Sequence, residues 1–170
     1  MGRKILLIVA SQGFRDEEYS QPKEIFETAG FEVQTASSKV GEIIGKLNGR
    51  AEAEMQLKDV DPSQFEAIVF VGGPGAVEYF HSPTALGLAK TAFEQNKVVA
   101  AICIAPSILA NAQILKGKQA TAFPTEAENL RQAGALYLKQ PVVVDGRIVT
   151  ASGPEAASEF AQKIVQLLQE

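Results

Sequence analysis

The stretch VVAAICIAPSILA, residues 98–110, decides the fold, because it reads as a buried strand that turns directly into a helix. Residues 98–102 form an unbroken apolar run, and Pro106 stands in the first turn of the expected helix. Between them lies Cys103, the only cysteine of the chain, with an alanine two residues away on each side. A sharp strand-to-helix turn leaves room only for small side chains at those positions. The pattern therefore predicts a nucleophile elbow with Cys103 at its apex.

The predicted position of Cys103 has a chemical consequence. Free N–H groups at the start of the following helix would point at the sulfur and stabilise a thiolate. We therefore expect a lowered pKa for the thiol and rapid reaction with iodoacetamide near neutral pH. The alternative is a buried, unreactive cysteine, because a free thiol also behaves as a small core hydrophobe.

Strand and helix patterns alternate along the whole chain, which predicts a single α/β domain over residues 1–170 with a doubly wound, mostly parallel sheet. The expected strands cover residues 4–10, 31–36, 67–71, 98–102, 117–123, 142–145 and 147–151. The expected helices cover residues 17–29, 84–95, 126–133 and 154–168, besides the helix after the elbow. Three glycines among short apolar stretches in residues 39–58 predict a small hairpin excursion.

Composition narrows the classes of partner. The formal net charge is −4 and no segment gathers lysine and arginine, so we expect no nucleic-acid partner. The apolar runs are too short to cross a membrane. One cysteine and one histidine provide no recognisable metal-ligand cluster, and we expect neither a metal nor a cofactor. A lone cysteine and a first strand without a signal-peptide pattern favour a cytoplasmic protein.

Three loops should meet at one edge of the sheet. The turns after strands 4–10, 67–71 and 98–102 follow parallel strands, whose carboxyl ends share that edge. They carry a run of acidic residues, a glycine-rich turn (GGPG, residues 72–75) and the thiol of Cys103. The glycine-rich turn fits neither the dinucleotide nor the P-loop spacing, so a phosphate cradle is disfavoured.

These motifs, in this order, resemble the ThiJ/PfpI superfamily, which includes the parkinsonism-associated deglycase and archaeal PfpI-type proteins. The resemblance covers nearly the whole chain and depends on five segments: FRDEE (14–18), VFVGGPG (69–75), AAICIAPSILA (100–110), LKGKQATAFP (115–124) and VVVDGRIVTASGP (142–154). It implies a flavodoxin-like sandwich, a homodimer or higher homo-oligomer, and a reactive cysteine beside an acidic residue.

The resemblance also implies which residues surround the thiol. Counting back from Pro22 and Gly30, the acid that meets Cys103 falls at Asp16, with Glu17 and Glu18 as the next candidates. In PfpI-type members the acid can stand one residue earlier, which is Arg15 here. Asp16 can also be read as an ordinary helix cap.

Three further positions follow from the resemblance. The backbone N–H groups of Gly73 and Ile104 match the family's oxyanion donors, although a glycine-rich loop can equally be a simple turn. Glu78, placed with a one-residue gap, matches an acid that reaches the site of a neighbouring subunit.

The histidines that amide chemistry needs are missing from the matching positions. Ile104 stands where peptidase-type members carry histidine, and Phe123 stands where another branch carries one. The single histidine, His81, precedes Ser-Pro and is typical of a surface or capping residue. Peptidase and glutaminase activities are therefore disfavoured, because both need a base that shuttles a proton.

Two kinds of function remain. The first is a glyoxalase-, deglycase- or hydratase-like enzyme in which Cys103 acts on a small carbonyl-type electrophile. The second is a non-catalytic stress protein, a redox sensor or chaperone-like protein whose Cys103 is oxidised.

Overall fold

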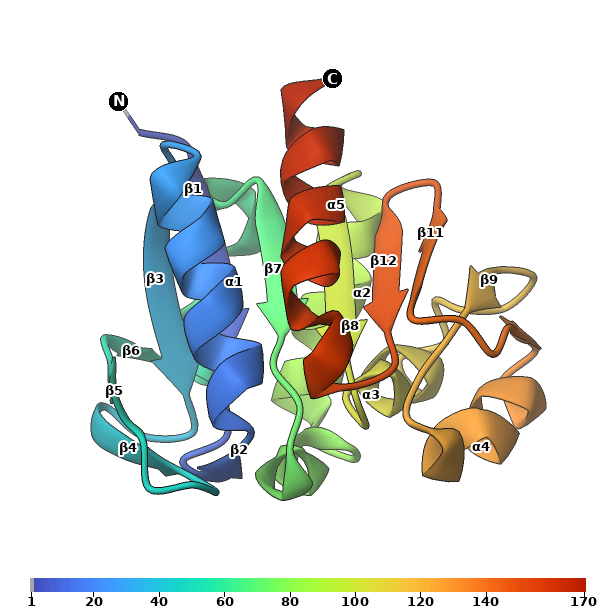
Figure 1. The fold of residues 1–170 in the computed structure, drawn as a ribbon, viewed down its shortest axis with the longest axis horizontal. Helices are drawn as coiled ribbons and strands as arrows, with labels where there is room; N and C mark the ends of the chain where they lie inside the picture. The colour runs from blue at the N-terminus through green and yellow to red at the C-terminus, as the bar shows by residue number, and fades with distance from the viewer. Residues whose placement is uncertain (1) are drawn as a thin grey trace.

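The computed structural model describes residues 2–170 and is built on a central sheet of seven strands (Figure 1). These strands are β1 (Lys4–Ile8), β3 (Glu32–Ser37), β6 (Met55–Gln56), β7 (Ala67–Phe70), β8 (Val98–Ile102), β11 (Val142–Asp145) and β12 (Ile148–Ala151). Their order across the sheet is β11-β12-β8-β7-β1-β3-β6. All neighbours pair in parallel except β11 and β12, which form an antiparallel hairpin with Gly146 in the turn between them.

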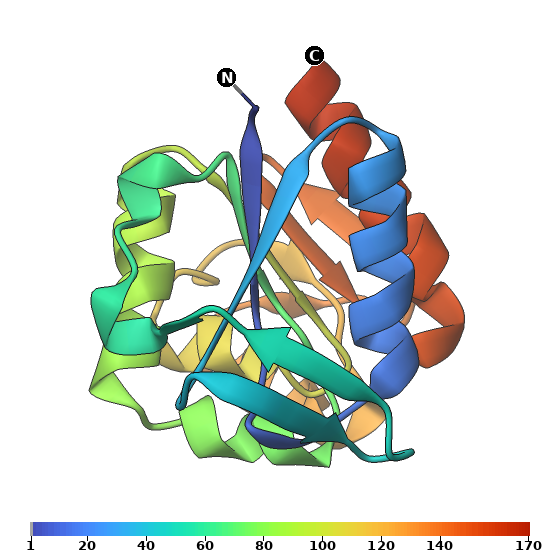
Figure 2. The same ribbon diagram turned by 90° about the vertical axis from the view of Figure 1, so that its left-hand side faces the viewer.

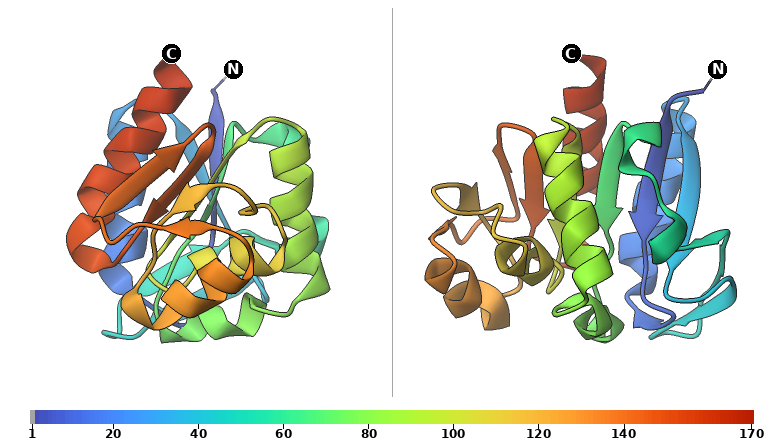
Figure 3. Two further views of the ribbon diagram at one scale, coloured as in Figure 1. Left: turned by 90° about the vertical axis from the view of Figure 1, so that its right-hand side faces the viewer. Right: turned by 180° about the vertical axis from the view of Figure 1, so that it is seen from behind.

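Helices cover both faces of this sheet, as expected for a doubly wound fold. One face carries α1 (Asp16–Thr28) and α5 (Ala157–Gln169), which lie side by side in Figure 2. The opposite face carries α2 (Pro83–Glu94), α3 (Pro106–Asn111) and α4 (Ala127–Gln132), and the view from behind in Figure 3 shows α2 crossing it. The predicted flavodoxin-like, mostly parallel sandwich is confirmed.

The central strands are buried on both sides because their residues alternate between two cores. In β8, Val99 and Ala101 pack in the core under α2, whereas Val98, Ala100 and Ile102 pack in the core under α1 and α5. All five residues are fully buried. An unbroken apolar run is the sequence signature of such a strand.

The predicted hairpin excursion is also present. Strands β4 (Gly41–Gly45) and β5 (Arg50–Ala53) pair antiparallel, and β2 (Gln12–Phe14) joins them as a third strand. The chain then returns to the main sheet through β6, which pairs with β3. The sequence did not predict β2 or β6, since both are too short to show periodicity.

The strand expected over residues 117–123 is only partly correct. It reduces to β9 (Gln119–Ala120), which pairs with β10 (Leu136–Tyr137) outside the main sheet. Beyond it, the backbone N–H of Thr121 donates a hydrogen bond to the hydroxyl oxygen of Thr150 instead of to a strand partner. Short 3-10 helices complete the chain: η1 (Leu57–Asp59), η2 (Pro62–Gln64), η3 (Pro74–Tyr79), η4 (Pro124–Glu126) and η5 (Pro154–Ala156).

Within residues 2–170, none of the helices combines the length and the apolar character that crossing a membrane requires.

Removing the aromatic side chain of Phe160, which is fully buried in the core between α5 and the sheet, should destabilise the fold strongly. We expect Phe160→Ala to lower the free energy of unfolding by about 3–5 kcal/mol, measured by urea denaturation. Lys163→Ala, at an exposed position of the same helix, should change it by no more than about 0.5 kcal/mol. A loss below about 1 kcal/mol for Phe160→Ala would contradict this packing.

Candidate active site

Cys103 lies at the apex of a strained turn between β8 and α3. Its φ of 66° is in the left-handed region, which residues other than glycine seldom adopt. Two backbone hydrogen bonds hold the turn: the N–H of Cys103 donates to the Ala151 carbonyl at 2.9 Å, and its carbonyl accepts from the Phe123 N–H at 2.8 Å. This is the predicted strand–turn–helix elbow. Strain of this kind persists where the surrounding structure fixes it, and it is common at active sites.

The acid beside the thiol is Glu18. Its side chain is fully buried in the first turns of α1, and it interacts with the thiol of Cys103. Gly72, at the end of β7, makes this approach possible. A Cβ atom at Gly72 would lie 2.6 Å from the Cβ of Cys103 and would collide with a carboxyl oxygen of Glu18. Three elements therefore meet at a point where only glycine fits.

Burial decides the protonation state of Glu18. Removal from water raises its pKa to about 8, although the contact with the Cys103 thiol and the charge of Arg15 act in the opposite direction. Neither carboxyl oxygen has a hydrogen bond of regular geometry within residues 2–170. A carboxylate could not be buried in this way without a large cost, so Glu18 is a neutral carboxylic acid near pH 7.

The thiol is not activated in the way the sequence predicts. Burial is the largest cause, and together with the negative charge of Glu18 it raises the pKa of Cys103 to about 12. The backbone N–H groups of Gly73 and Ile104 oppose this by hydrogen bonding to the sulfur. The predicted lowering of the thiol pKa is therefore wrong, because desolvation outweighs the two N–H donors. The carboxyl of Glu18 and the thiol of Cys103 titrate as a coupled pair, and burial raises the pH at which each proton is lost.

Gly73 and Ile104 lie where the resemblance implies, with their N–H groups at the sulfur. Gly73 has a φ of 105°, and a Cβ atom there would collide with the backbone of Arg15. Arg15 in turn donates its N–H to the Gly72 carbonyl at 2.9 Å. The glycine-rich turn is thus locked against the start of α1, and it presents a fixed donor to the thiol.

The structure places Asp16 away from the thiol, which corrects its predicted pairing with Cys103. Its two carboxyl oxygens accept the backbone N–H groups of Leu47 and Gly49, at 2.9 and 2.6 Å. Asp16 is also not the helix cap: it is the first residue of α1, and Arg15 occupies the cap position without a side-chain capping bond.

Glu17 is likewise not beside the thiol. Its carboxylate forms a two-pronged ion pair with the guanidinium of Arg15, with both N–O distances at 2.9 Å. This pair lowers the pKa of Glu17 and raises that of Arg15.

A signal in the sequence could have identified Glu18. Along a helix, residues four apart share a face, and Glu18 precedes Pro22 and Phe26 at this spacing. All three are buried. Counting from landmarks located the acidic run but did not determine which of its members points inward.

Two other predicted residues lie elsewhere. The Glu78 carboxylate, on η3, accepts the backbone N–H of Ser11 at 3.0 Å, and its role toward a neighbouring subunit stays a prediction. His81 is exposed and lines a separate cavity of about 710 Å³, together with Asn111 and Lys116.

Cys103 opens into a cavity of about 340 Å³, large enough for a small organic molecule. The residues that line it come from six segments of the chain: Arg15, Lys46, Gly73, Pro74, Cys103, Ile104, Phe123, Thr125, Pro154 and Glu155. No histidine is among them. Phe123 is 40% exposed and gives the cavity an apolar wall.

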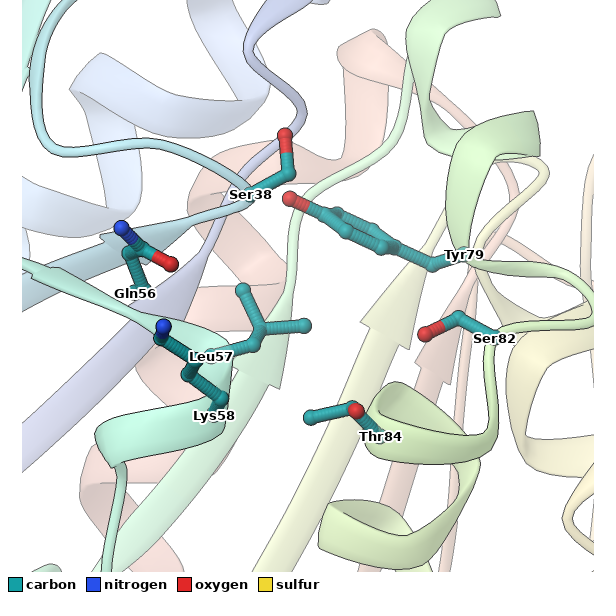
Figure 4. Close-up of a pocket in the computed structure, with 7 residues that line it drawn as sticks. All are labelled: Ser38, Gln56, Leu57, Lys58, Tyr79, Ser82 and Thr84. Carbon is teal, nitrogen blue, oxygen red and sulfur yellow. The ribbon is translucent and has the colours of Figure 1, made fainter.

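A further cavity of about 170 Å³ lies between the end of β3 and the start of α2 and is shown in Figure 4. The hydroxyl end of Tyr79 points toward Ser38 there. That hydroxyl already donates to the Val9 carbonyl at 2.8 Å, and burial raises the pKa of Tyr79 to about 12. The Tyr79 hydroxyl thus joins η3 to Val9, the residue that follows β1. Across the part of the chain that the structure describes, no three histidine, cysteine or acidic side chains form a metal-binding cluster.

Comparisons of the sequence and of the structure with known proteins find the same family. The model of the DJ-1/PfpI family matches residues 3–167. An uncharacterized protein of Methanocaldococcus jannaschii is 43% identical over 98% of this chain and 82% of its own. A deglycase of Thermococcus kodakarensis is 34% identical over 96% of this chain and 98% of its own. The crystal structure of a ThiJ/PfpI domain protein from Brachyspira murdochii superposes with a TM-score of 0.97 at 36% identity, covering 99% of this chain and 97% of that one.

The buried carboxyl of Glu18 makes the stability of the fold depend on pH. Its pKa is raised from 4.5 to about 8, so the folded state holds a proton that the unfolded chain releases. Stability therefore falls by about 1.4 kcal/mol for each unit as pH rises between these values. Glu18→Gln should remove this dependence, so that the variant matches the native protein at pH 5 and exceeds it by several kcal/mol at pH 8.

Urea denaturation at a series of pH values measures the effect. Glu17→Gln is the matched control, because Glu17 is partly exposed and its pKa is lowered, and its profile should keep the native slope. A native-like slope in Glu18→Gln would show that another group carries the buried proton.

Proposed function

This chain belongs to the DJ-1/PfpI family, and we propose that it is a glyoxalase- or deglycase-like enzyme acting on small 2-oxoaldehydes and related carbonyl compounds. One observation carries the proposal. A neutral carboxyl, that of Glu18, is buried against the thiol of Cys103 at a strained elbow that opens into a cavity. The Thermococcus relative named a deglycase supports the same class of chemistry.

The first step is addition of Cys103 to the carbonyl carbon. The S–C bond forms as the π bond of the carbonyl breaks, and the product is a hemithioacetal. A neutral carboxyl can give a proton from one oxygen while it accepts one at the other. Glu18 therefore takes the thiol proton and protonates the carbonyl oxygen, so no free thiolate is required. This suits a thiol whose pKa is raised.

The N–H groups of Gly73 and Ile104 serve the same step. They already direct partial positive charge at the sulfur. As the carbonyl oxygen gains negative charge next to that sulfur, fixed donors in a partly dry site stabilise it without reorganisation.

The remaining steps can use the same carboxyl. Two proton transfers through Glu18 move a hydrogen from the aldehyde carbon to its neighbour, which leaves a thioester of a 2-hydroxy acid on Cys103. Water then hydrolyses the thioester and regenerates the thiol. The net reaction adds one water to the 2-oxoaldehyde. A carboxyl with a pKa of about 8 can both donate and accept protons near neutral pH.

Other functions are less well supported. A peptidase or glutaminase needs a base that returns a proton to a leaving amine, and His81 lines a different cavity from Cys103. A redox-sensing cysteine is normally exposed and of low pKa, whereas Cys103 is 9% exposed with a raised pKa. The cytoplasmic location and the homo-oligomeric state stay predictions.

The proposal is tested by the formation of lactate from methylglyoxal. We expect Cys103→Ser to reduce kcat/KM by more than about a hundredfold, because it removes the nucleophile. We expect Glu18→Gln to reduce it by about 10²–10⁴-fold, since an amide cannot transfer the proton.

Two variants provide the controls. His81→Ala and Glu17→Gln should both stay within about threefold of the native rate, because neither side chain touches the thiol. Full activity in Cys103→Ser would rule out the thiol as nucleophile. Loss of activity in Glu17→Gln with full activity in Glu18→Gln would show that Glu17, and not Glu18, transfers the proton.

A further inference from the structure

The cavity beside Cys103 has a distinctive arrangement of charge. Arg15 lines it, but its guanidinium is held by the carboxylate of Glu17 through two bonds of 2.9 Å. Glu155 lines it from the loop after β12 and carries negative charge. Lys46 is the other cation on the wall, and none of its ion-pairing distances within residues 2–170 is as short as 4.0 Å. Its ammonium group is therefore available to a ligand.

Lys46 belongs to the turn between β4 and β5, and this turn is fixed to the start of α1. Asp16 accepts N–H bonds from the residues that follow Lys46, namely Leu47 at 2.9 Å and Gly49 at 2.6 Å. The backbone N–H of Lys46 itself donates to the Phe14 carbonyl at 2.8 Å. A lysine on an exposed hairpin tip is thereby held at the mouth of the Cys103 cavity.

The turn is shaped to receive this carboxylate. A Cβ atom on Gly45 or on Gly49 would collide with the carboxyl group of Asp16. The N–H of Gly45 also donates to the Gly49 carbonyl at 2.8 Å and closes the turn. Gly45 and Gly49 therefore leave the space that the Asp16 carboxylate occupies, and the turn is fixed in one conformation.

We propose that Lys46 is a specificity-determining residue that favours electrophiles with an anionic group next to the reactive carbon, and that Asp16 is the positioning residue that holds it. The inference deepens the proposed function, since it names the class of carbonyl compound that the site prefers: a 2-oxoaldehyde that also bears a carboxylate. Glu155, which also lines the cavity, opposes this preference.

A pair of alkylating agents tests the preference without any need for turnover. Iodoacetate and iodoacetamide react alike with Cys103: the S–CH₂ bond forms, iodide leaves and the thiol proton is released. They differ in charge, so the ratio of their rates cancels any change in thiol pKa. We expect Lys46→Gln to lower the iodoacetate-to-iodoacetamide ratio by about threefold at low salt, the size typical of one exposed charge. At 1 M salt the native ratio should fall to that of the variant.

Three variants separate positioning from simple charge. Lys46→Arg should keep the native ratio, and Glu155→Gln should raise it. Asp16→Asn removes a negative charge, so electrostatics alone would raise the ratio. If Asp16 positions Lys46, the ratio falls instead, and the double variant with Lys46→Gln is no lower than Lys46→Gln alone. Lys90→Gln, on α2 across the sheet, is the control for net charge and should leave the ratio unchanged.

The outcomes distinguish this inference from the proposed function. An unchanged ratio in Lys46→Gln, or a ratio that rises in Asp16→Asn, overturns the inference even if methylglyoxal is turned over. Conversely, a protein that turns over no carbonyl compound can still show the predicted ratios. In that case the selectivity of the site stands and the proposed reaction fails.

Discussion

The contact between the Glu18 carboxyl and the Cys103 thiol constrains everything around it. A carboxylate cannot be buried there without a partner, so the group is neutral, and its pKa lies near 8 instead of 4.5. A neutral carboxyl is both a donor and an acceptor, which is the property that proton transfer at a thiol needs. The contact exists only because Gly72 has no side chain, since a single Cβ atom would separate α1 from the elbow.

Sheet topology brings these elements together. β7 lies between β1 and β8, and all three run parallel, so the loops at their carboxyl ends share one edge. The segment after β1 supplies the acid, the loop after β7 is the glycine-rich turn, and the turn after β8 carries the thiol. The β4–β5 hairpin lies at this end of the sheet (Figure 2), which is how a residue from an excursion outside the main sheet reaches the cavity.

Sequence patterns predicted the sheet, the elbow and the hairpin excursion, because apolar runs and glycine turns are local signals. They did not predict the state of the thiol, because burial is a property of the packed molecule. In an isolated elbow the two N–H donors at Cys103 would lower its pKa; in the folded protein desolvation is the larger effect. The same limit applies to Lys46, whose place in the wall of the Cys103 cavity depends on tertiary contacts that no spacing in the sequence encodes.

The acidic run after β1 shows how much one residue of register matters. Consecutive residues of a helix point about 100° apart, so its three acids face three different surroundings. Asp16 meets the hairpin, Glu17 meets Arg15, and Glu18 enters the core. The same chemical group thus becomes a clamp, an ion-pair partner or a buried acid, depending only on its direction. For such a run, the apolar face of the helix identifies the acid that reaches the thiol, and distance along the chain does not.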